Sequence, residues 1–192
     1  MKRLAICFVL AVMLVACGGI PLRAIPRLMQ LQTELLNANP AEFMVAVQVD
    51  ARIAPPPGAA PVMQLDIRPR EPGAFAAIER KLPMRLNATS ANSLGLAAVG
   101  INRRWLIYSF PPESQAELSR IQAFIKKLQA RSDGKDGGSI AVGIAQDGVA
   151  AKDPALAKTK WESWLQTSRR EGFFELWSGS VEELLKQANS AS

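Results

Sequence analysis

The sequence predicts a single α+β domain with a twisted, mainly antiparallel or mixed sheet of about six strands and helices packed mainly on one face. Short segments of alternating apolar and polar residues follow one another between residues 43 and 110, through links that favour antiparallel neighbours. A long amphipathic pattern then begins, and strand-like and helical patterns alternate from there to the C-terminus. We find no internal repeat.

The sequence pattern in the first half of the domain predicts one helix followed by strands. Apolar residues recur at helical spacing over 22–38. Alternating patterns predict strands over 43–49 and 62–68. Residues 74–87 fit both a helix and a strand, and Pro83 favours an edge strand because proline is disfavoured inside a helix.

The sequence pattern in the middle of the chain predicts further strands before and after one long helix. A weak alternation suggests a strand over 94–101, and clearer patterns predict strands over 105–110 and 140–144. Pro111-Pro112 begins the helix, and Ser114 with the Glu three residues later can form a capping box. The apolar stripe of this helix consists of Leu118, Ile121, Ile125 and Leu128.

Two more helices and a strand are expected near the C-terminus. The first helix covers 153–172 and carries Trp161 and Trp164 on one face. That pair can line a groove for a sugar or a peptide, or it can pack in the core. A strand follows over 173–177, and Ser180, with a Glu three residues later, caps the last helix. These last strands could add parallel neighbours to the sheet.

The N-terminus has the three-part organisation of a secretory signal. Lys2 and Arg3 form a basic start, an apolar run covers residues 4–15, and small residues follow it. A membrane-spanning helix needs about 20 apolar residues, so this run is too short for a permanent anchor.

The end of this run, Leu14-Val15-Ala16-Cys17, resembles the lipobox of bacterial lipoproteins. The resemblance implies that diacylglycerol is attached to Cys17, that residues 1–16 are removed, and that the new amino group is acylated. Two or three acyl chains hold a protein stably on a bilayer. Gly18 stands where enterobacterial lipoproteins retained at the inner membrane have Asp. This implies the periplasmic face of the outer membrane, with the inner membrane as the alternative.

The resemblance ends at residue 19, and we recognise no family motif beyond it. Removal of the signal leaves 176 residues, enough for one domain with a hydrophobic core and too few for two. We therefore expect residues 17–21 to be a lipidated cysteine and a short tether, and residues 22–192 to be the domain. The tether is short enough to hold the domain close to the lipid head groups.

Composition excludes several classes of function. After the signal is removed, 21 Lys and Arg face 17 Asp and Glu, a balance too mild for a dedicated nucleic-acid-binding protein. The chain has no His, and its two cysteines are Cys7, inside the signal, and Cys17. Ser-His-Asp and Cys-His catalysis are therefore excluded. The turn at 132–139 has Ser-x-x-Lys spacing without the companion motifs, and its two Asp lack the Glu of a calcium loop. We assign no catalytic residue, metal or cofactor.

Basic residues gather on the expected strands and make the one candidate ligand surface. This surface can bind an anionic ligand such as phosphate, a lipid head group or a glycan, or it can be a solvated face with edge-protecting charges. It consists of Arg68, Arg70, Arg80, Lys81, Arg85, Arg103 and Arg104.

The sequence therefore predicts a membrane-tethered envelope lipoprotein that acts as a non-enzymatic binding or assembly accessory. Its expected partners are the membrane, through the lipid on Cys17, and an envelope protein, an anionic polymer or a lipid. One alternative is a carboxylate-dependent hydrolase of cell wall or glycan, which needs two carboxyl groups about 5–10 Å apart across a cleft. A second alternative is a lipid- or lipopolysaccharide-binding module, with a basic rim beside an apolar cavity.

Overall fold

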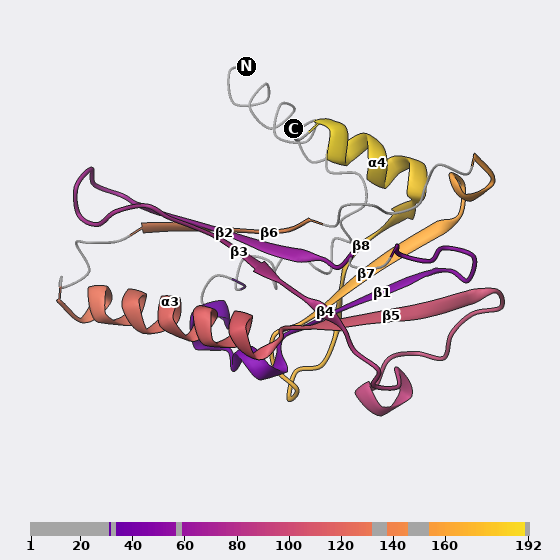
Figure 1. Cartoon of the computed structure of the whole chain (residues 1–192), viewed down its shortest axis with the longest axis horizontal. Helices are drawn as coiled ribbons and strands as arrows, with labels where there is room; N and C mark the ends of the chain where they lie inside the picture. The colour runs from indigo at the N-terminus through magenta and orange to yellow at the C-terminus, as the bar shows by residue number, and fades with distance from the viewer. Residues whose placement is uncertain (1–30, 32–33, 57–58, 132–137, 146–153, 191–192) are drawn as a thin grey trace, which may run out of the picture.

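Two antiparallel β-sheets make up most of the fold (Figure 1). The computed structural model describes residues 31, 34–56, 59–131, 138–145 and 154–190. Within these residues eight strands form a five-stranded and a three-stranded sheet. The predicted α+β class is confirmed. The strands are more numerous than the six expected, they divide into two sheets, and helices are a minor part.

The larger sheet has its first long strand at the centre. Every pairing in it is antiparallel, so the expectation of parallel neighbours near the C-terminus is wrong. In spatial order the strands are β4 (Arg85–Leu86), β5 (Arg103–Ser109), β1 (Met44–Asp50), β7 (Lys160–Gln166) and β8 (Phe174–Ser180).

The smaller sheet has β2 (Val62–Pro69) at its centre, between β3 (Ile78–Pro83) and β6 (Gly138–Ala145). The alternation along β2 follows the prediction, because Met63, Leu65 and Ile67 are buried and the two residues between them are not. The edge strand β6 contains no charged residue and no proline.

Between β3 and β4 the chain passes directly from the smaller sheet to the larger one. β3 ends at Pro83, β4 begins at Arg85, and the buried Met84 between them donates its backbone N–H to the carbonyl of Pro61 at 2.9 Å. Both strands lie at sheet edges. The edge strand favoured by Pro83 is therefore confirmed. It is divided into β3, at the edge of the smaller sheet, and β4, at the edge of the larger sheet.

The main core lies between the two sheets and is closed by helix α3 (Pro112–Arg131). Figure 1 shows α3 running beside the smaller sheet. Leu118, Ile121 and Ile125 of its predicted stripe are buried, and Leu128 packs against the same cluster. Ser114 does not make the predicted capping box, because the helix already begins at Pro112 and the Ser114 hydroxyl donates to the carbonyl of Pro83 at 2.8 Å.

The predicted first helix lies mostly outside the described residues. Leu31 and residues 34–37 are helical, and Leu31 and Leu35 are buried in the main core. A short 3-10 turn, η2 (Pro40–Glu42), then leads into β1.

Two other expectations for secondary structure are wrong. Residues 94–101 are not a strand, because the 3-10 turn η3 (Asn92–Leu94) and irregular chain occupy this region. The helix expected over 153–172 is replaced by the short turn η4 (Pro154–Leu156) and the strand β7. The spacing of Trp161 and Trp164 resembles a helix because both faces of β7 are covered, and a strand buried on both faces loses its simple alternation.

The last helix begins as predicted. In α4 (Val181–Ser190), the Glu183 backbone N–H donates to the Ser180 hydroxyl at 3.2 Å, and the Glu183 carboxylate accepts from the Ser180 backbone N–H at 2.7 Å. This is the reciprocal capping box. The predicted strand before it is β8.

A second, smaller core covers the outer face of the larger sheet. It contains Met44, Ala46 and Ile107 from the strands and Leu96 from the irregular chain after η3. Trp105 and Trp164 meet edge to face beside it, with ring centroids 6.2 Å apart. Because Trp161 is buried in the main core instead, the two tryptophans of β7 lie on opposite faces. They do not line a common groove.

Candidate functional site

A groove with a volume of about 480 Å³ opens where the chain passes between the two sheets. One wall belongs to the β1–β2 connection, a second to the β3–β4 passage, and the floor to β5. The lining residues are Pro55, Pro56, Ala59, Ala60, Met84, Arg85, Leu86, Arg104, Leu106 and Tyr108. All but the two arginines are apolar or aromatic.

Arg104 brings a cation onto the core-facing side of β5. It stands opposite Val49, which is fully buried, and Leu106 and Tyr108 continue the same row because alternate residues of a strand share a face. Arg104 is half-buried, and its Nε is buried without a hydrogen-bond partner among the described residues. Its guanidinium forms no ion pair with a described carboxylate. The groove therefore contains a positive charge that no described residue compensates, beside an apolar floor.

The mouth of the groove is formed by the two residues of β4. Leu86 stands opposite Tyr108, on the groove side, and 61% of its surface is exposed. Arg85 stands opposite Ser109, so its side chain starts from the other face of the sheet, and it is exposed. Of the two arginines that line the groove, Arg104 is therefore the one that belongs to β5, the strand that forms the floor.

The basic residues of the smaller sheet lie elsewhere. Arg68 and Lys81 share the outer face of this sheet, where Arg68 contacts Asp66 at 2.9 Å. Arg80 points to the opposite face and contacts Glu117 of α3 at 3.1 Å. Arg70 follows β2 and is exposed. The seven basic residues chosen from the sequence therefore do not share one face, and the groove brings together Arg85 and Arg104 alone.

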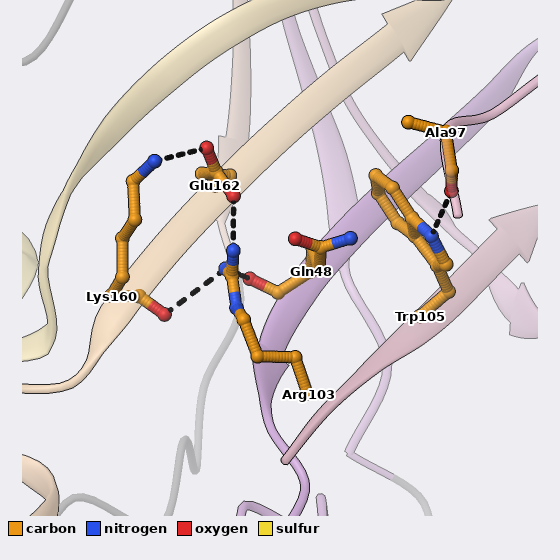
Figure 2. A network of polar contacts seen from close by, with 6 residues as sticks. All are labelled: Gln48, Ala97, Arg103, Trp105, Lys160 and Glu162. Atoms are coloured by element: carbon orange, nitrogen blue, oxygen red, sulfur yellow. Dashed lines mark hydrogen bonds and ion pairs between the residues drawn. The ribbon is translucent and has the colours of Figure 1, made fainter. Parts of the chain in front are cut away.

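Arg103 belongs to a polar network on the outer face of the larger sheet (Figure 2). Its guanidinium contacts Glu162 at 2.5 Å and donates to the carbonyls of Gln48 at 2.7 Å and Lys160 at 3.3 Å. The Lys160 ammonium contacts the other carboxylate oxygen of Glu162. Burial raises the pKa of Glu162, but the hydrogen bonds from Lys160 and Arg103 outweigh it and hold the pKa below its usual range. The network joins β1, β5 and β7, so Arg103 has a structural role.

A second groove, of about 320 Å³, carries two carboxylates. It lies between the helical residues near Glu34 and the turn that joins β7 to β8, where Glu171 lies. The Thr167 hydroxyl donates to Glu34 at 3.0 Å, and Glu171 lies 4.0 Å from the Arg170 guanidinium. Glu34 and Glu171 are the two carboxylates in this groove on which a carboxylate-dependent hydrolase would depend.

Other features named from the sequence fall outside the described residues. Cys17, the signal and the tether lie there, as does most of the turn at 132–139, whose residues 132–137 are not described. In the part of the chain that the structure covers, no helix is long and apolar enough to cross a membrane. No three His, Cys, Asp or Glu residues of that part gather where they could hold a metal ion.

Comparison with known proteins adds no relationship, since no family model, curated protein or solved structure matches this chain. The site must therefore be interpreted from its own residues.

Sequence reasoning included Arg104 in the candidate surface but missed the groove around it. A signal was present, because the order Arg104, Trp105, Leu106, Ile107, Tyr108 places the arginine in one row with Leu106 and Tyr108. The contributions of Pro55, Pro56, Ala59 and Ala60 have no such signal. They reach the groove through the path of a connection between two sheets, which a strand pattern does not specify.

Proposed function

We propose that this chain is a lipid-anchored envelope protein that binds a ligand and does not transform it. Cys17 carries the lipid and holds the domain at the periplasmic face of the outer membrane. The observation that carries this proposal is the sequence Leu14-Val15-Ala16-Cys17 at the end of an apolar signal of the right length.

The groove at the join of the two sheets supports the binding role. Ligand sites are typically concave and mostly apolar, with a small number of polar groups that fix orientation. The groove has this composition, with Arg104 as its polar group. A short tether would keep this site near the membrane surface, so its ligand would be met there.

The lipid anchor is tested by the variant Cys17→Ser. Without the thiol no diacylglycerol can be attached, so we expect an unprocessed precursor that incorporates no radiolabelled palmitate. Cys7→Ser is the matched control, because that thiol lies inside the signal and its loss should leave processing unchanged. Processing and membrane retention of Cys17→Ser at the level of the unaltered protein would refute the anchor.

The two carboxylates of the second groove support an alternative function, the hydrolysis of cell wall or glycan. Incubation of the purified full-length protein with cell-wall sacculi separates the two functions, with release of soluble muropeptides as the measurement. We expect no release. Release that is lost in Glu34→Gln and Glu171→Gln, and kept in the control Glu79→Gln outside the groove, would establish the hydrolase instead.

A further inference from the structure

We propose that the groove at the join of the two sheets binds an anionic lipid, with an acyl chain along its floor and the anionic group on Arg104. This inference rests on the proposed function, since a domain tethered at the membrane surface would meet lipids there. Three properties of the groove support it: a cation without a described partner, an apolar lining and a suitable shape.

The cation is the first property. Removing a guanidinium from water is costly unless an anion or a set of hydrogen bonds compensates it. Other arginines of the described chain are compensated in this way, as Arg103 is by Glu162 and Arg80 by Glu117. Arg104 is half-buried opposite Val49, its Nε is buried without a hydrogen-bond partner, and no described carboxylate pairs with its guanidinium. An anionic ligand would supply the missing charge.

The apolar lining restricts the chemical class of that ligand. Apart from the two arginines, the walls offer the side chains of proline, alanine, methionine, leucine and one tyrosine. A glycan or a polar peptide buried here would leave hydroxyl or amide groups without partners, and each such group costs free energy. An acyl chain has no polar group to satisfy, and every methylene that it buries is favourable.

The shape of the groove agrees with this class. Its volume of about 480 Å³ lies within the range of about 300–1,000 Å³ that is usual for small-molecule sites. The groove is open at the edge of the larger sheet, where Leu86 exposes an apolar side chain at the mouth. A lipid could therefore enter with part of its chain still outside.

The test measures binding of dodecyl phosphate to the purified full-length protein by native mass spectrometry, from a non-ionic detergent. The uncharged detergent competes for the apolar floor alone, and inorganic phosphate serves as the probe for a free anion. We expect one dodecyl phosphate per protein. Arg104→Met should weaken this binding by about tenfold or more, because a charge-assisted hydrogen bond is lost.

Arg70→Met is the matched control, since it removes an equally charged, exposed residue outside the groove and should leave the affinity unchanged. Leu86→Asp places a negative charge at the mouth on a side chain that is largely exposed, so it should weaken binding without disturbing the fold. The thermal midpoint of Arg104→Met should not fall, because methionine suits an apolar site better than an unpaired guanidinium. A merely structural arginine would lower that midpoint.

Three results would overturn the inference: no binding of dodecyl phosphate, equal weakening in Arg104→Met and Arg70→Met, or equally tight binding of inorganic phosphate. Binding is measured on purified protein, so a failure of the lipid-binding proposal can be distinguished from a failure of the proposal that Cys17 is lipidated. A groove that binds dodecyl phosphate while Cys17→Ser is processed normally would refute the anchor alone. If the protein is anchored but binds no dodecyl phosphate, only the proposal that the groove binds an anionic lipid is refuted.

Discussion

Two neighbouring arginines show how one position along a strand decides the role of a side chain. Arg103 and Arg104 are chemically identical, but alternate residues of β5 face opposite sides of the larger sheet. Arg103 meets Glu162 and two backbone carbonyls, whereas Arg104 meets the apolar groove. Arg103 therefore supports the fold, whereas Arg104 lies in the groove without a described ion-pair partner.

The Arg103–Glu162 pair gives a prediction for stability. The two side chains are only 19% and 14% exposed, so Glu162→Gln should lower the free energy of unfolding at about pH 7 by about 1–3 kcal/mol. Glu79→Gln is the control, because Glu79 is largely exposed, 3.6 Å from Arg68, and such pairs contribute at most about 1 kcal/mol. Urea denaturation measures both effects. Equal effects of the two substitutions would contradict a structural role for the network.

The same pair gives a prediction for pH. In the folded state burial raises the pKa of Glu162, but the hydrogen bonds from Lys160 and Arg103 outweigh this effect, so the pKa lies below its usual value. Its contribution is therefore fully present above the unfolded pKa of about 4.3 and is lost as the pH falls through the lower folded pKa. The difference between the unaltered protein and Glu162→Gln should shrink in acid. A difference that stays constant down to about pH 3 would contradict this linkage.

At the scale of the elements, the capping box of α4 was predictable because it is local. The side chains of Ser180 and Glu183 each accept a hydrogen bond from the backbone N–H of the other residue, three positions away, and no distant part of the chain takes part. The strand β7 was mistaken for a helix for the opposite reason. Its faces are covered by two different cores, and this depends on the position of β7 inside the larger sheet. A local pattern does not contain that information.

The capping box itself can be tested with Ser180→Ala. Loss of the hydroxyl leaves the Glu183 backbone N–H without its partner, and the expected cost is about 1 kcal/mol. Faster hydrogen exchange of the first turn of α4 would show where the stability is lost. Glu182→Gln removes an exposed carboxylate that pairs with Lys186, so it should cost less stability than Ser180→Ala. A larger effect of Glu182→Gln than of Ser180→Ala would refute this assignment.

At the scale of the whole molecule, the sequence predicted the α+β class and the antiparallel pairing of the strands between residues 43 and 110. It did not predict two sheets, because the division takes place inside a continuous extended segment. Residues 78–86 look like one strand in the sequence, and the passage at Met84 becomes visible only in the pairing with β2 and β5. The groove depends on this passage, and for that reason only Arg104 and Arg85 of its lining were anticipated.

Both walls of the groove are connections between the two sheets, and the Met84–Pro61 hydrogen bond ties them together at one end. The groove thus lies at the junction of the two sheets. A ligand seated in it would contact both connections at once, and so would link the two sheets at a second place beside this hydrogen bond.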